Sequence, residues 1–147
     1  MRQTSAPTVP ARLAFHKMVG AGNDFVVLLV PVAAGGFQGV FVPAKDPSFR
    51  PGDAYFYNHS DATIVGFVGR TTFTLTPGQG RIVRPTQPRA EGFYDVGFGV
   101  RSNEGDRPLH NTRWPVEQNI RSYIFFYPNP RNGNPTFRAV DEFVAIE

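Results

Sequence analysis

Residues 93–101 read FYDVGFGVR, and this stretch decides the fold class. Apolar side chains recur at every second position from Tyr94 to Val100, while Asp95, two glycines and Arg101 occupy the positions between and after them. Successive side chains of a β-strand point to opposite faces of the sheet. The period of two therefore predicts a strand with one face in a hydrophobic core and the other outside it.

The same kind of pattern extends along the chain on both sides of this stretch. In residues 72–76, which read TFTLT, the side chains of Phe73 and Leu75 share one face. From residue 25 onward, runs rich in β-branched and aromatic residues alternate with clusters of Gly, Pro, Asn and Asp about every 8 to 12 residues, as in all-β sandwiches and barrels. The runs comprise residues 25–32, 39–42, 54–58, 63–68, 72–76, 81–84, 93–101, 121–127 and 136–141, with a weaker run at 109–114.

Turn residues separate these runs, and helical periodicity is nearly absent. Pro51–Gly52 and Pro77–Gly78 suit type II turns, because Pro fixes φ at the first corner and Gly accepts the positive φ of the second. Asn132–Gly133 indicates a loop between the last two strands, and residues 115–119 could form at most one helical turn. We expect an all-β fold, a single antiparallel β-sandwich of about nine or ten strands, Ig-like or jelly-roll-like, over residues 25–147.

The segment before the first apolar run differs in character. Residues 1–12 read MRQTSAPTVPAR and have no apolar period that could anchor them to a core. Such a segment is typical of an extended arm, which in an oligomer can lie across a neighbouring subunit. We therefore expect residues 1–24 to form an extended N-terminal arm and entry loop.

Composition excludes several kinds of chemistry. The 147 residues, 41% of them hydrophobic, suit one domain with one core. The absence of cysteine excludes disulfides, thiolate nucleophiles, zinc–thiolate sites and iron–sulfur clusters. The three histidines are dispersed, and no nucleophile elbow or phosphate-binding loop occurs. We predict a protein that is not an enzyme and has no metal or cofactor. The alternative is an enzyme that uses carboxylates such as Asp95, Asp141 and Glu142, but no feature of the sequence supports it beyond the presence of these residues.

Charge and hydropathy limit the partners. A net charge of +3 is too small to mark a nucleic-acid binder, so we consider nucleic acid an improbable partner. The longest apolar run, at residues 25–32, is far shorter than the roughly 20 residues of a membrane-spanning helix. No clear signal peptide is recognisable, and a secreted or cell-envelope location is favoured slightly over a cytoplasmic one.

Residues 15–25, which read FHKMVGAGNDF, resemble the opening of diaminopimelate epimerases, whose first strand and loop typically read F-x-K-M-H-G-x-G-N-D-F. The resemblance implies that Asn23 would contact an amino-acid substrate, although Val19 replaces the usual histidine. The epimerase reaction uses two cysteines as base and acid, and this chain has none. We therefore interpret the match as a coincidence or a remnant.

A second resemblance covers more of the chain. The segments that carry it read FRPGDAYFYNHS at residues 49–60, FTLTPG at 73–78, RWP at 113–115 and YIFFYP at 123–128. They resemble a set of uncharacterised bacterial β-sandwich proteins, in which a P-G strand, an L-x-P-G turn and a late R-W recur in that order. The resemblance implies the sandwich fold and no known activity.

Three runs are apolar on both faces, at residues 26–30, 55–57 and 123–127. Strands of this kind are either covered on both sides or contribute to a contact with another chain. We predict a non-catalytic structural or accessory subunit that acts through protein–protein contacts in a homo- or hetero-oligomer. The candidate contact residues on these runs are Tyr55, Tyr57, Tyr123 and Tyr127.

The alternative is a binding module for carbohydrate or another small ligand. Trp114, which follows Arg113, would then be an exposed platform helped by Tyr123 and Tyr127; a single Trp that fills the core is the competing interpretation. Arg70, Arg81, Arg84 and Arg89 lie in a stretch without acidic residues, which favours a solvated strand edge over an anion site. Residues 58–60, NHS, also fit a glycosylation sequon.

Overall fold

The computed structural model describes residues 14–20, 23–31, 34–43 and 46–145. These residues form eleven β-strands and no helix, which confirms the all-β fold class. Residues 116–119, where one helical turn was conceivable, form no regular secondary structure, with a bend at residues 118–119. No helix in the described part of the chain could cross a membrane.

The chain divides into two compact units, Met1–Asp46 and Pro47–Glu147. The N-terminal unit holds one antiparallel sheet in the order β1-β2-β3, made of β1 (Ala14–Gly20), β2 (Asn23–Pro31) and β3 (Phe37–Pro43). The division thus falls after residue 46, whereas the sequence suggested a boundary after residue 24. Part of the expected entry loop is strand β1, and residues 1–13 of the expected arm lie outside the described residues.

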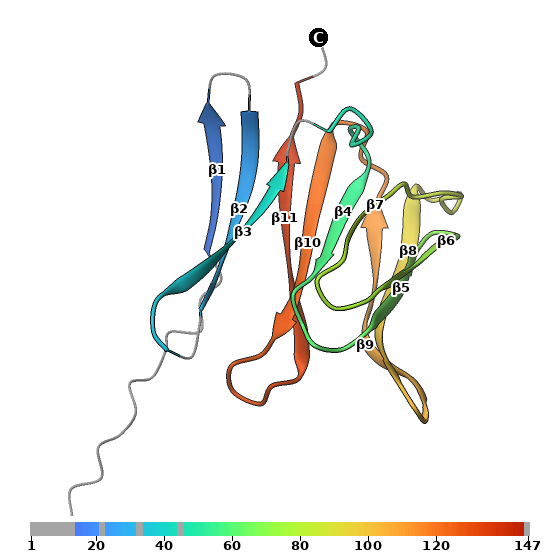
Figure 1. The fold of residues 1–147 in the computed structure, drawn as a ribbon. Helices are drawn as coiled ribbons and strands as arrows, with labels where there is room; N and C mark the ends of the chain where they lie inside the picture. The colour runs from blue at the N-terminus through green and yellow to red at the C-terminus, as the bar shows by residue number, and fades with distance from the viewer. Residues whose placement is uncertain (1–13, 21–22, 32–33, 44–45, 146–147) are drawn as a thin grey trace, which may run out of the picture. The chain divides into compact units, whose positions relative to one another are not determined.

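The C-terminal unit contains two sheets of four strands each (Figure 1). The first sheet has the order β11-β10-β4-β7 and the second sheet the order β6-β5-β8-β9. Their strands are β4 (Ala54–Asn58), β5 (Ile64–Val68), β6 (Thr71–Leu75), β7 (Gly80–Val83), β8 (Phe93–Ser102), β9 (Gly105–Pro115), β10 (Ile120–Pro128) and β11 (Pro135–Phe143).

Strand pairing in these sheets is antiparallel with one exception. Strands β5 and β6, β8 and β9, and β10 and β11 pair as neighbours in the chain. Strand β4, in contrast, pairs in parallel with β10, with Tyr55 opposite Tyr123. The first sheet therefore joins an early and a late segment of the sandwich side by side.

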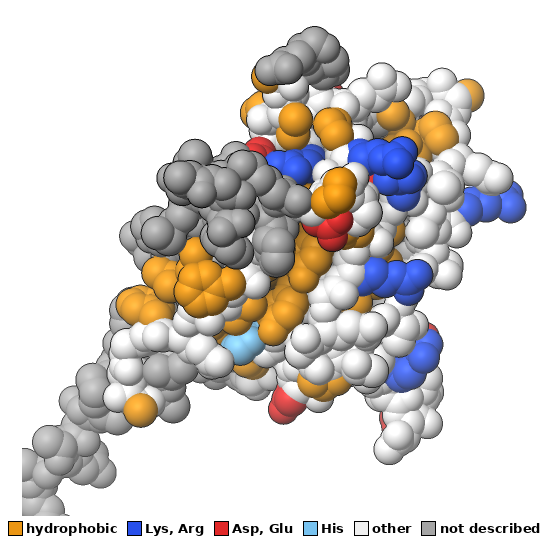
Figure 2. All heavy atoms as spheres, turned by 45° about the horizontal axis from the view of Figure 1, so that its top comes forward, with side chains coloured by type: hydrophobic (Ala, Val, Ile, Leu, Met, Phe, Trp, Pro, Cys, Tyr) orange, Lys and Arg blue, Asp and Glu red, His pale blue; other side chains and the backbone are white. Residues whose placement is uncertain are grey.

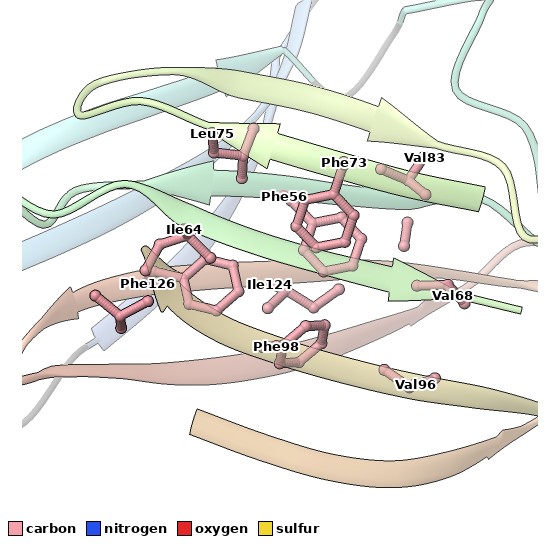
Figure 3. Packing of buried hydrophobic residues seen from close by; sticks show 12 residues of the cluster. Phe56, Ile64, Val68, Phe73, Leu75, Val83, Val96, Phe98, Ile124 and Phe126 are labelled. Atoms are coloured by element: carbon pink, nitrogen blue, oxygen red, sulfur yellow. The ribbon is translucent and has the colours of Figure 1, made fainter. Parts of the chain in front are cut away.

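The core lies between the two sheets, and the period of two explains its composition. Phe56 of β4, Ile124 of β10 and Phe98 of β8 point into it, as Figure 3 shows, with exposed fractions of 0%, 0% and 3%. Phe56 packs on Phe73 with ring centroids 4.4 Å apart. Each such buried side chain contributes about 1.5–3 kcal/mol relative to an exposed one. The inward faces predicted for residues 72–76 and 93–101 are confirmed.

Both predicted Pro-Gly turns are present. Gly52 and Gly78 have φ values of 89° and 80°, which a residue with a Cβ rarely adopts. The turns close through backbone hydrogen bonds from Asp53 N to Arg50 O (3.0 Å) and from Gln79 N to Thr76 O (3.1 Å). Asp53 is itself buried and accepts hydrogen bonds from Arg84 Nε at 2.9 Å and Nη2 at 2.8 Å.

Candidate functional site

The four candidate tyrosines lie together on the first sheet. Tyr55 and Tyr57 alternate along β4 with side chains that face the core, and Tyr123 and Tyr127 lie on the neighbouring strand β10. Because β4 and β10 are paired in register, all four belong to the face that is turned away from the core. The structure thus brings together residues that are about 70 positions apart in the sequence.

One end of this tyrosine face is closed by the segment before β4. Phe49 is 3% exposed and meets the ring of Tyr123 edge-on, with centroids 5.2 Å apart. The guanidinium carbon of Arg121 lies 5.0 Å from the centre of the Phe49 ring, on which it forms a cation–π contact. Tyr123 is only 1% exposed, so it belongs to the internal packing of the chain, while Tyr55, Tyr57 and Tyr127 are half-buried.

A charged pair lies beside these rings. Arg121 Nη2 of β10 donates to Glu142 Oε2 of β11 at 2.8 Å, and the hydroxyl of Tyr123 donates to the same oxygen at 2.9 Å. Burial, with this hydrogen bond and the carboxylate charge, raises the pKa of Tyr123 well above its ordinary value. Burial also raises the pKa of Tyr55, to which Tyr57 adds a smaller effect. The arrangement therefore joins two strands and holds the hydroxyl of Tyr123 protonated.

Trp114 and Arg113 lie on β9, in the other sheet. The indole of Trp114 is nearly parallel to the ring of Phe56, at 13° and 6.3 Å between centroids, and meets Phe98 at 6.0 Å. Trp114 also lines a hollow of about 130 Å³, which is smaller than the roughly 300–1,000 Å³ of typical ligand sites. The structure does not place Trp114 on a common surface with Tyr123 and Tyr127.

The arginines of the acid-free stretch have different environments. Arg84 binds the buried carboxylate of Asp53, and Arg89 Nε donates to Asp95 Oδ2 at 2.6 Å. Arg113 Nε lies 3.7 Å from the other oxygen of Asp95. The guanidinium of Arg70 has no ion-pair partner among the described residues. Arg84 and Arg89 therefore stabilise the local structure through ion pairs, whereas the guanidinium of Arg70 is available to bind an anion.

The carboxylates of the catalytic alternative do not converge. Asp95 lies on β8 of the second sheet and pairs with Arg89, whereas Asp141 and Glu142 lie on β11 of the first sheet. Asp141 accepts a hydrogen bond from the hydroxyl of Ser122 at 2.7 Å. Within the described residues, no three His, Asp or Glu side chains lie close enough together to hold a metal ion.

Asn58 of the glycosylation sequon is a structural residue. It is 0% exposed, and its amide nitrogen donates to the backbone oxygens of Ala62 (2.7 Å) and Leu75 (3.0 Å). Its amide oxygen accepts hydrogen bonds from the backbone nitrogen and the hydroxyl of Ser60. A buried amide whose donors and acceptor are engaged is inaccessible to a glycosyltransferase in the folded protein.

Two accessible surfaces were not among the sequence-derived candidates. Phe37 and Phe41 of β3 are 53% and 67% exposed. The outer face of the second sheet also carries two adjoining hollows, of about 470 and 680 Å³, which both border Phe67 and Asn111. The first surface could have been predicted from the sequence, because Phe37, Gly39 and Phe41 occupy every second position of one strand. The hollows could not, because they are lined by strands that are distant in the sequence.

Comparisons of the chain with protein-family models, with curated proteins and with solved structures find no match. The two surfaces that are accessible and chemically distinctive are the phenylalanines of β3 and the hollows on the second sheet.

Proposed function

We propose that this protein is a non-catalytic structural or accessory subunit that acts through protein–protein contacts. The observation that carries the proposal is the exposure of Phe37 and Phe41, at 53% and 67%, on one side of strand β3. Figure 2 shows hydrophobic side chains gathered at the surface on the left of the view, where Figure 1 has strands β2 and β3. Large exposed apolar patches are typical of contact sites between proteins.

The backbone of β3 makes this surface flat. Phe37, Gly39 and Phe41 occupy every second position and therefore share one side of the strand. The ring of Phe41 lies 3.4 Å from the position that a Cβ of Gly39 would occupy. The Phe41 ring therefore leans along the strand instead of standing away from it. Burial of each phenylalanine by a partner would contribute about 1.5–3 kcal/mol.

The edge position of β3 supports the same proposal. Strand β3 is the last strand in the order β1-β2-β3, and its seven residues, FQGVFVP, carry no charge. Edge strands that must avoid partners usually carry charged residues or are interrupted by a bulge. An uncharged edge with exposed phenylalanines favours the addition of a strand from another subunit.

The two faces of this sheet give a further reason. Val26, Leu28 and Val30 of β2 lie on one face and alternate with Val27 and Leu29 on the other, and Val27 is 6% exposed, as buried as the residues of the first face. Phe41 lies opposite Val27 in the pairing of β2 with β3, so the phenylalanines extend the second apolar face. Because Val27 is itself buried, the exposed part of this face is the part on β3, at Phe37 and Phe41, and a partner would cover it there.

The test is the oligomeric state of the protein purified from its own host, measured by native mass spectrometry. We expect a defined assembly that is lost in the double variant Phe37→Ser/Phe41→Ser. Phe143→Ser is the matched control, because Phe143 of β11 is 76% exposed but lies in the other unit. A wild-type protein that is monomeric at all concentrations, or an assembly that survives the double substitution, would contradict the proposal.

A further inference from the structure

A trough runs over the outer face of the second sheet, independently of the β3 surface. It consists of the two adjoining hollows, of about 470 and 680 Å³, that share Phe67 of β5 and Asn111 of β9 as lining residues. Each volume falls within the roughly 300–1,000 Å³ that is typical of ligand sites. The trough is therefore large enough to hold several units of a linear ligand.

Glycines of β8 create the floor of the trough. The outward positions of this strand are Asp95, Gly97, Gly99 and Arg101, because Val96, Phe98 and Val100 face the core. Two successive outward positions thus have no side chain. The sheet is consequently hollowed in the middle and bordered by charged side chains at its ends.

The ring of Phe67 lies across this floor. Its Cε1 and Cζ atoms come within 2.5 and 2.7 Å of where a Cβ of Gly97 would be, so only glycine leaves room for the ring in this position. The side chain is 37% exposed. A ring laid along the sheet with one face open to solvent is a suitable platform for a flat apolar surface, such as one face of a sugar ring.

Polar side chains surround the platform. Thr72 and Thr74 of β6 supply hydroxyl groups on one side, and Asn111 supplies an amide on the other. The Asn111 Oδ1 atom is 2.8 Å from the position of a Cβ on Gly97, so the amide also lies over the floor. Hydroxyls and amides both donate and accept hydrogen bonds, which suits a ligand rich in hydroxyl groups.

The charge of the trough is positive. Four arginines (Arg70, Arg89, Arg101, Arg107) and two aspartates (Asp95, Asp106) line the two hollows, an excess of two positive charges. Arg89 and Arg101 pair with Asp95 and Asp106, but Arg70 and Arg107 have no ion-pair partner among the described residues. Arg70 borders one hollow and Arg107 the other.

We propose that this trough binds a linear acidic polysaccharide whose sugar units carry carboxylates. The aromatic platform would hold one sugar ring, the hydroxyl and amide groups would contact its hydroxyls, and the separated arginines would pair with successive carboxylates. Single-stranded nucleic acid fits less well, because its sites stack successive bases on several aromatic rings. Of the three phenylalanines that border the hollows, Phe73 and Phe98 are 3% exposed and belong to the core cluster, so Phe67 is the ring that the trough offers to a ligand.

The experiment is a calorimetric titration of the full chain with a hexamer of galacturonic acid at low and at high salt. We expect binding that weakens as salt rises, because the charges are exposed to solvent. Phe67→Ala should weaken it about tenfold, and the double variant Arg70→Gln/Arg107→Gln by about threefold to tenfold. The matched controls Phe143→Ala and Arg138→Gln, both on β11 of the first sheet, should bind as the wild type does.

Nuclear magnetic resonance of the same complex locates the site. The amide signals of Gly97 and Gly99 should shift on titration, while those of β11 should not. Absence of binding at millimolar hexamer, signal shifts confined to the first sheet, or equal affinity for cellohexaose at all salt concentrations would each overturn the proposal. Tighter binding of oligothymidylate than of the hexamer would also overturn it, in favour of nucleic acid. The arginine double variant keeps the test decisive if Phe67→Ala fails to fold.

Discussion

Asn58 joins three segments of the sandwich through one side chain. Its amide group connects the end of β4 with the backbone oxygen of Leu75 on β6 and with Ser60 and Ala62 in the loop between β4 and β5. Because the side chain is fully buried, water cannot replace any of these bonds if the amide is removed. The residue that matches a glycosylation sequon in the sequence thus has a structural role, because its buried side chain holds these segments together by hydrogen bonds.

We expect Asn58→Ala to lower the free energy of unfolding by about 2–4 kcal/mol, since it leaves several buried polar groups without partners. Urea unfolding followed by Trp114 fluorescence measures the change. Asn103→Ala is the control, because Asn103 is exposed in the turn between β8 and β9 and should change stability by less than about 0.5 kcal/mol. A similar effect for both substitutions would show that the hydrogen bonds of Asn58 contribute little.

At the scale of the element, local patterns predicted the strands but not their partners. Alternation in residues 93–101 and 72–76 predicted β8 and β6, because the period of two is a property of neighbouring residues. Strand β1 was missed, since its sequence AFHKMVG shows only weak alternation of apolar and polar residues. The parallel pairing of β4 with β10, and with it the shared face of the tyrosines, depends on contacts between distant residues that no local pattern contains.

The pairing of β10 with β11 has a consequence at alkaline pH. The pKa of Tyr123 is raised in the folded protein by burial and by its bond to Glu142, so the folded state holds this proton more tightly than the unfolded state does. The stabilisation is fully present below the ordinary tyrosine pKa of about 10 and is lost as the pH rises above it. We expect the free energy of unfolding to fall as the pH rises above about 10, and Tyr123→Phe to make this fall smaller.

Urea unfolding at a series of pH values measures this difference in slope. Tyr127→Phe is the control, because Tyr127 lies on the same strand and face but is half-buried and has no comparable bond among the described residues. Part of the slope should remain in Tyr123→Phe, since burial also raises the pKa of Tyr55. An unchanged slope in Tyr123→Phe would show that Tyr123 ionises alike in both states.

At the scale of the whole molecule, the two units differ in what they bury. Every residue of the core cluster between the two sheets belongs to Pro47–Glu147, from Ala54 to Phe126. The N-terminal unit has one three-stranded sheet, with exposed phenylalanines on β3. The sandwich therefore has the material for independent stability, whereas a unit of 46 residues is close to the lower limit of roughly 40 for unaided folding.

We expect residues 47–147, produced alone, to unfold in one cooperative transition, because the fragment retains both sheets and the whole core cluster between them. Residues 1–46, produced alone, should stay unfolded, since a unit of 46 residues with one three-stranded sheet buries too little apolar surface to offset the loss of chain entropy on folding. Circular dichroism and the dispersion of amide signals measure both outcomes. The fragment 47–147 should also retain affinity for the galacturonic acid hexamer, because no residue that lines the trough precedes Val65. A fragment 47–147 that lacks a cooperative transition would show that the N-terminal unit completes the sandwich, and the two units would then have to be treated as one folding domain.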